Sequence, residues 1–158
     1  MTKLENLECL AYEQDIHIHD YSFSEDKKAC CYHDTDKGWD YKAILLDRPQ
    51  IKSNIEETLL LAEELGHFVT DSLYLIKSIA NTKAERSNRL KYENKAKKWA
   101  LREVLPPDKI KSCWSRGIYE LHEISEELDY LPYDFILKAI DHYRATNELP
   151  QLWESYES

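Results

Sequence analysis

The scarcity of glycine and proline is the feature that most constrains how this chain can fold. The 158 residues include only three glycines and five prolines, the residues that most often form tight turns and interrupt regular structure. Such a composition is poorly suited to the many turns of an all-β sandwich or barrel, and it is not that of a collagen-like or low-complexity protein. Leu, Ile, Val and Phe together exceed the ~20% below which chains remain disordered. The sequence therefore predicts a folded protein in which helices dominate.

A short helix and a small sheet are expected in the first third of the chain. Apolar residues at helical spacing predict a helix that ends near Tyr12. Alternation of apolar and polar side chains, followed by polar turn segments, predicts half-buried strands. These strands are expected at residues 16–23, 29–33 and 41–46. We expect them to form a small N-terminal antiparallel sheet.

Two long helices are expected next. Ser53 or Asn54 can cap a helix that runs to about Ser72 or beyond, and the acidic residues of its first turn suit the positive end of the helix dipole. A second long helix is expected to begin between residues 82 and 86. It ends at Pro106, because a proline pushes the preceding residue out of helical geometry.

The end of the chain predicts a helical hairpin. Two shorter helices are expected at residues 118–128 and 133–145, separated by a short break. They could pass for a helix-turn-helix, but the second carries few basic residues, so a hairpin that covers the core is the better account. We find no internal repeat or linker and expect one α+β domain over residues 1–158.

Charge and hydropathy bear on the partners of the protein. The net charge is −9 and the pI is about 5.2. Because an acidic protein repels phosphate backbones, nucleic acid is not expected as a partner. Eight basic residues gather at positions 83–102, which we interpret as a solvated helix face, although such a face could also dock an acidic protein or nucleic acid. The longest uninterrupted apolar runs, such as residues 59–62, are far shorter than the ~20 residues that cross a bilayer, so no membrane partner is expected.

The cysteines and the first residues predict a cytoplasmic protein. The four cysteines include no C-x-x-C pair and are interpreted as reduced thiols; they are Cys9, Cys30, Cys31 and Cys113. Cys113 is expected to be a small buried residue rather than a nucleophile. The start of the chain, interrupted by Glu5 and Glu8, does not resemble a secretory leader.

The candidate chemistry lies in the first long helix. Glu63 and His67 are four residues apart, so they point in the same direction from the helix, along an apolar stripe begun by Leu59 and Leu60. A carboxylate and an imidazole directed toward a core need each other, a hydrogen-bond network or a metal ion. Gly66 costs a helix about 1 kcal/mol relative to alanine, but it allows another element to approach that turn closely.

The second long helix offers a matching carboxylate. Glu93 shares its face with apolar residues that predict a buried stripe, namely Leu90, Ala96, Ala100 and Val104. The alanines of this stripe would allow the two long helices to pack closely. Glu63, His67 and Glu93 could then converge into a cage of three ligands with one open position, as catalytic divalent metal sites require.

Here the sequence resembles a known family. The string Leu-Ala-Glu-Glu-Leu-Gly-His at residues 61–67 looks like the active-site helix of the ImmA/IrrE metallopeptidases of bacteria, phages and mobile elements. Those proteins carry H-E-x-x-H in this helix, followed by an E-x-x-A motif and a helix that ends in proline. The chain has E-x-x-A at residues 93–96 and Pro106 at the matching place. The resemblance covers roughly residues 41–143.

The resemblance implies a gluzincin-like core with a metal site. His67 and Glu93 would bind the metal, Glu64 would be the general base, and Glu63 would be the third ligand in the place where the family usually has histidine. The metal is expected to be zinc (Zn²⁺), with Mn²⁺ or Fe²⁺ possible because two of the three ligands are carboxylates. Tyr74 and His122 are candidate donors for the oxyanion.

The resemblance also implies a biological role. The protein would be an endopeptidase of a prophage or mobile element that acts as an anti-repressor by cleaving or destabilising a helix-turn-helix transcriptional repressor. The alternative is an inactive relative that binds a repressor or host protein through the same groove.

Ordinary structural roles remain open for the same residues. An i,i+4 pair such as Glu63 and His67 is often a simple helix pair, and Glu93 could be a structural acid. His17, His19 and His33 could supply a metal ligand from the sheet, although the alternation of strand residues favours the solvent side for His17 and His19.

Overall fold

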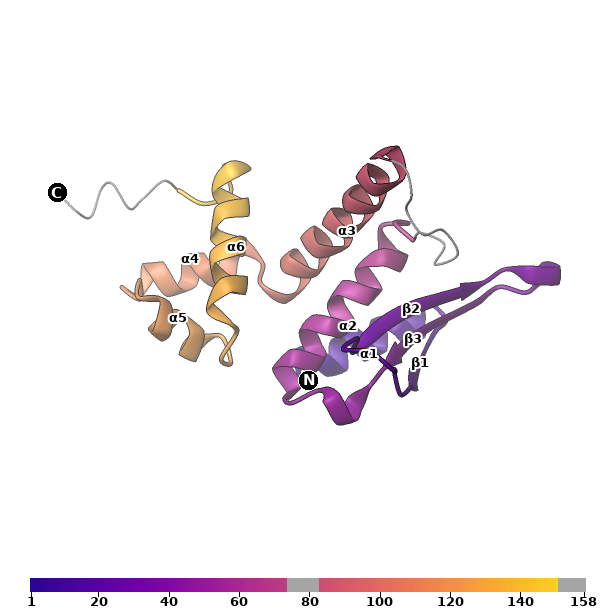
Figure 1. Cartoon of the computed structure of the whole chain (residues 1–158). Coiled ribbons are helices and arrows are strands. Elements are labelled where there is room, and N and C mark those ends of the chain that lie inside the picture. Colours follow the sequence, from indigo (N-terminus) through magenta and orange to yellow (C-terminus); the bar gives the residue numbers. More distant parts are fainter. Residues whose placement is uncertain (74–82, 151–158) are drawn as a thin grey trace. The chain divides into compact units, whose positions relative to one another are not determined.

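The structure is a computed structural model that describes residues 1–73 and 83–150. Within these ranges it contains a three-stranded mixed sheet and six α-helices, which confirms the predicted α+β class (Figure 1). The chain divides into two compact units, Met1–Ala100 and Leu101–Ser158. Each unit is described by itself, and the single domain over residues 1–158 stays a prediction.

The sheet consists of β1 (Ile16–Asp20), β2 (Ala29–Asp34) and β3 (Tyr41–Leu46), in the order β1-β3-β2. β2 and β3 form the expected antiparallel hairpin, but β1 runs parallel to β3, so the prediction of an antiparallel sheet was wrong for that pair. The reason is that β3 enters between the two earlier strands. It buries residues of both its faces, Ala43 and Ile44 among them, and a strand that is apolar on both faces belongs in the centre of a sheet.

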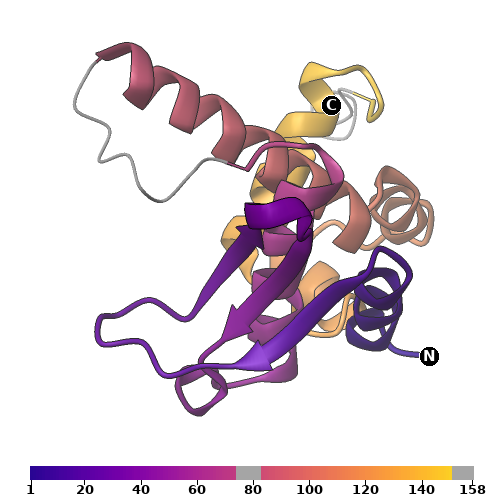
Figure 2. The same cartoon turned by 90° about the vertical axis from the view of Figure 1, so that its right-hand side faces the viewer.

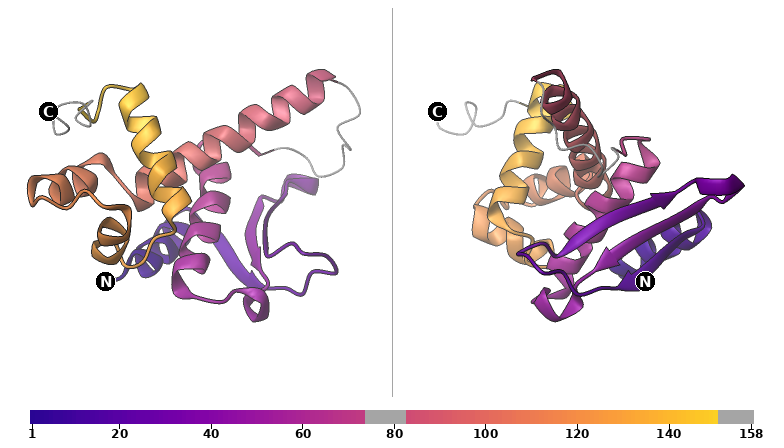
Figure 3. Two further views of the ribbon diagram at one scale, coloured as in Figure 1. Left: turned by 60° about the vertical axis from the view of Figure 1, so that its left-hand side comes forward. Right: turned by 45° about the vertical axis from the view of Figure 1, so that its right-hand side comes forward.

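One face of the sheet carries the core of the N-terminal unit. α1 (Lys3–Glu13) contacts β1, and α2 (Asn54–Val69) contacts β2 and β3 (Figure 2). Figure 3 shows the two helices on the same side of the sheet. The apolar strand residues turned toward them are buried, namely Ile16, Ala29, Ile44 and Leu46. His17 and His19 lie on the opposite, exposed face, as predicted.

The ends of α1 and α2 follow from local capping. Thr2 and Glu5 form a capping box at the start of α1. The Ser53 hydroxyl accepts a hydrogen bond from the backbone N–H of Glu56, which confirms the expected cap of α2. α2 ends at Val69, short of the predicted Ser72, because Asp71 takes a left-handed conformation with φ of 51°.

The remaining helices include one that the sequence analysis did not predict. α3 (Lys83–Val104) ends before Pro106 as expected, and α5 (Leu121–Glu127) and α6 (Tyr133–Ala145) match the predicted short helices. The unpredicted helix is α4 (Pro107–Ser115), which lies between α3 and α5 in the chain. The sequence analysis uses Pro106 only as the end of the preceding helix, whereas the next residue, Pro107, occupies the first turn of α4, where proline is favoured because no N–H is needed there.

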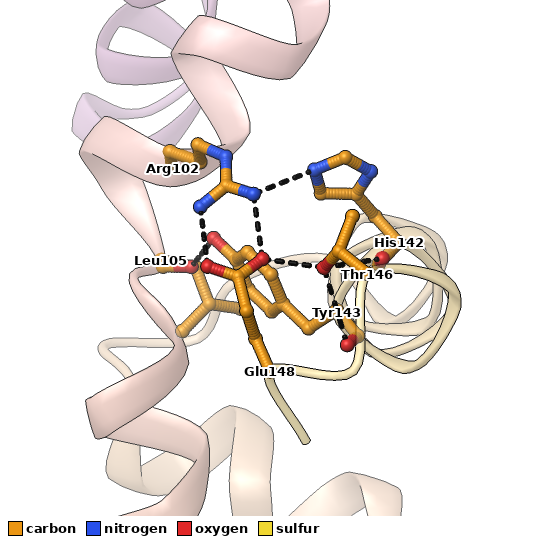
Figure 4. A network of polar contacts seen from close by, with 6 residues as sticks. All are labelled: Arg102, Leu105, His142, Tyr143, Thr146 and Glu148. Atoms are coloured by element: carbon orange, nitrogen blue, oxygen red, sulfur yellow. Dashed lines mark hydrogen bonds and ion pairs between the residues drawn. The ribbon is translucent and has the colours of Figure 1, made fainter.

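A polar network stabilises the C-terminal unit (Figure 4). The two Nη atoms of Arg102 donate to the carboxylate oxygens of Glu148 at 2.8 and 2.6 Å, and this interaction holds the pKa of Glu148 at about 2. The buried Tyr143 hydroxyl donates to the Leu105 carbonyl at 2.6 Å. Leu105 lies in the break between α3 and α4, and this hydrogen bond from Tyr143 satisfies its carbonyl.

The Glu148 interaction predicts a specific dependence of stability on pH. Because the folded-state pKa of about 2 lies below the ordinary value of 4.5, the stability contributed by Glu148 is complete above pH 4.5 and is lost as the pH falls toward 2. The difference in free energy of unfolding between wild type and Glu148→Gln should therefore shrink over this range. Urea denaturation at successive pH values measures it, with Glu126→Gln at an exposed position of α5 as the control. A difference that stays constant with pH would contradict the prediction.

Candidate metal centre

The candidate site lies where α2 and α3 pack against each other. A Cβ atom built on Gly66 would lie 2.6 Å from the Ala96 carbonyl oxygen and 3.0 Å from its Cα. Only glycine allows this approach, because the atoms it meets belong to the backbone. Ala96, Ala100 and Val104 are buried as predicted, but Leu90 is 62% exposed. The predicted stripe was wrong at Leu90, since the described residues of α3 before Tyr92 are exposed throughout.

The backbone just after the C-terminal end of α2 orients the His67 ring. Its side chain is buried, and Nδ1 lies 3.1 Å from the Ser72 carbonyl oxygen. A carbonyl only accepts, so Nδ1 carries the proton and donates. In the neutral imidazole, Nε2 then holds the lone pair that metal binding requires. This nitrogen lies 3.7 Å from the Glu93 Oε2 atom of α3, which brings together two of the predicted ligands.

A cysteine that the sequence analysis did not select lies in the same cluster. Cys31 of β2 is on the face of the sheet that meets α2, and its Sγ, a Glu64 carboxylate oxygen and a His67 ring nitrogen all lie within 4.8 Å of one another. The sequence contained one indication of this position: Cys31 is two residues after the buried Ala29 in β2, so the two side chains point to the same face of the sheet. That signal shows which face Cys31 occupies, but not which helix residues it meets.

Burial and negative charge dominate the electrostatics of the cluster. Burial raises the pKa of the Glu64 carboxyl, the charges of Glu63 and Glu93 raise it further, and the Cys31 thiol and His67 oppose this shift. Burial also raises the pKa of the Cys31 thiol well above its usual range, and the neighbouring Glu64 charge adds to the effect. Several carboxylates thus share a partly buried space with one imidazole, and a bound cation would relieve their repulsion.

The structure places Glu63 beside this cluster. It is half-buried on α2, and its charge acts on Glu64. The cluster of donor atoms among the described residues contains the Glu64 carboxylate, whereas the sequence analysis expected the Glu63 carboxylate as a ligand. The donor types nevertheless fit a divalent cation, because imidazole nitrogen, carboxylate oxygen and thiolate sulfur are the ligands found at zinc sites.

The other candidate residues lie elsewhere. His33 pairs with Asp40 at 2.6 Å and packs edge-on against the Phe68 ring. Cys113 is buried, as predicted. Tyr74 lies outside the described residues, and His122 is exposed in the C-terminal unit.

Comparisons with protein-family models, with curated proteins and with solved structures find no match to this chain. In residues 1–73 and 83–150, every helix is too short or too polar to cross a bilayer.

Proposed function

We propose that this protein is a metal-dependent peptide-bond hydrolase with a gluzincin-like centre. Its metal ligands are Glu63, His67 and Glu93, and its general base is Glu64. The observation that carries this proposal is the approach of His67 Nε2 to Glu93 Oε2, at 3.7 Å, across the close packing of α2 on α3. The crowded carboxylates support it, because their charge favours a cation at this place.

Zinc is the proposed metal, and Mn²⁺ or Fe²⁺ also suit the carboxylates. A bound divalent metal supplies Lewis-acid polarisation of the scissile carbonyl and makes water more acidic. Glu64 performs the proton transfers: one carboxylate oxygen accepts a proton from the attacking water and returns it to the leaving amine nitrogen. The Nδ1–H of His67, held by the Ser72 carbonyl, keeps Nε2 directed toward Glu93.

The position of β2 suggests the class of substrate. In the described sheet, β2 has a neighbouring strand only on its β3 side, and Cys31 of β2 lies within 4.8 Å of the Glu64 and His67 donor atoms. An extended peptide that pairs with the open side of β2 would bring a peptide bond close to Glu64. The favoured substrate is therefore an extended or locally unfolded segment of a protein.

The biological role follows from the resemblance in sequence. We propose a cytoplasmic anti-repressor of a prophage or mobile element, which cleaves or destabilises a helix-turn-helix repressor. A second candidate, a protein that binds the repressor without cleaving it, is favoured by one observation. Glu63 stands where the resembled family has histidine, and a second carboxylate lowers the net positive charge of the centre.

Metal binding tests the centre directly. Titration of the metal-free protein with zinc, followed by calorimetry and mass spectrometry, is expected to show one bound ion per chain. His67→Ala and Glu93→Gln should each weaken binding by at least about 10-fold, since losing a ligand costs no less than losing the residue that supports one. The controls are His17→Ala, on the exposed face of the sheet, and Glu126→Gln in α5. Zinc affinity that is unchanged in His67→Ala would overturn the proposal.

A further inference from the structure

We infer that the Cys31 thiolate, in place of the Glu63 carboxylate, is the third ligand of this metal, so that β2 supplies a strong donor to a Cys31–His67–Glu93 centre. The inference rests on the proposed function for the existence of the metal. It goes further by adding a residue from the sheet and by naming the class of cation, a borderline-soft ion of the zinc type.

The distances fit a shared ion. Sγ of Cys31, a nitrogen of His67 and an oxygen of Glu64 lie within 4.8 Å of one another. Zinc–sulfur bonds of about 2.3 Å and zinc–nitrogen bonds of about 2.0 Å allow two such ligands of one ion to be up to about 4.3 Å apart. The Cys31 Sγ and the His67 nitrogen are therefore at most about 0.5 Å beyond a separation that one ion can bridge. The Glu93 oxygen, 3.7 Å from His67 Nε2, is already within this limit.

The sheet fixes where Cys31 lies. Cys31 is opposite Ile44 of the central strand β3, in the middle of the antiparallel ladder. Successive strand residues point to opposite faces, so Cys31 meets α2 while its neighbour Cys30 is turned to the other face. Both cysteines are free thiols of intermediate exposure. Cys30 therefore serves as a matched control for Cys31, because only the Cys31 thiol faces the proposed centre.

A Cys31 thiolate ligand explains how the centre can carry a carboxylate at residue 63. The resembled family has an imidazole ligand at the place of residue 63, and Cys31 would restore a strong donor from another element. Glu64 would then remain available for proton transfer. On binding, the S–H bond breaks, the proton leaves to solvent, and a sulfur–metal bond forms with no change in oxidation state. Thiolate ligation favours zinc, cobalt and cadmium over magnesium and manganese.

Cobalt(II) provides the test, because a cobalt–thiolate bond produces an intense near-ultraviolet charge-transfer absorption that nitrogen and oxygen ligands do not. Titration of the reduced, metal-free full chain with cobalt(II) should produce this band in the wild type and in Cys30→Ser. The band should be absent in Cys31→Ser, which should also bind zinc at least about 10-fold more weakly. Circular dichroism checks that each variant is folded.

A second measurement uses the wild-type protein, so it stands even if Cys31→Ser fails to fold. Saturating zinc should slow alkylation of Cys31 by iodoacetamide at least tenfold and leave the rate at Cys30 unchanged, as followed by peptide mass spectrometry. Cobalt or zinc that binds through His67 without the thiolate band and without protecting Cys31 would overturn this inference and leave the proposed function standing. A wild-type chain that binds neither ion would overturn both.

Discussion

Exchange of Gly66 for alanine is expected to lower the free energy of unfolding of the protein by about 2–3 kcal/mol. The sign is the reverse of the ordinary effect, because glycine to alanine inside a helix usually stabilises by about 0.5–1 kcal/mol. Here the new methyl group would meet the Ala96 carbonyl oxygen at 2.6 Å, so α2 and α3 would have to separate. Since His67 and Glu93 face each other beside this contact, zinc affinity should fall as well.

Chemical denaturation followed by circular dichroism measures the effect on stability. Asn88→Ala, at an exposed position of α3, is the control for an added helix former and should be neutral or slightly stabilising. The double variant Gly66→Ala/Ala96→Gly tests whether the new methyl group is crowded by the backbone of residue 96 or by the Ala96 side chain. It should not recover stability, because the crowded atoms of Ala96 belong to its backbone. A stabilised Gly66→Ala protein would show that the two helices do not pack at this distance.

Exchange of Glu64 for glutamine is expected to lower peptide hydrolysis by about 10²–10⁴-fold while zinc remains bound. Glutamine keeps the size of the side chain but cannot take a proton from water. The measurement is cleavage of a mixture of unstructured peptides by the zinc-loaded protein, followed by mass spectrometry. Zinc content is determined for the same samples, with Glu126→Gln as the control.

The outcomes of this experiment separate the two candidate functions. Equal cleavage rates in wild type and Glu64→Gln would show that Glu64 is not the base. A zinc-loaded wild type that cleaves no peptide, together with repressor inactivation that is unchanged in Glu64→Gln, would favour the protein that binds without cleaving.

Several parts of the candidate site follow from local sequence signals. Glu63, Glu64 and His67 lie on one helix because apolar spacing and the Ser53 cap define α2. The buried alanines of α3 and its end before Pro106 are also local properties. The error at Leu90 shows the limit of this reasoning, because an apolar residue at helical spacing becomes buried only where another element covers it.

The sequence by itself determined five of the described helices, the three strands and the helical turn that carries His67, because caps, prolines and periodic side chains act over a few neighbouring residues. Only the tertiary structure decided that β3 separates β1 from β2 and that Cys31 lies beside Glu64 and His67. The strand order and the contact of Cys31 depend on residues far apart in the chain. They form where burial of both faces of β3, and the packing of β2 on α2, outweighs local preference.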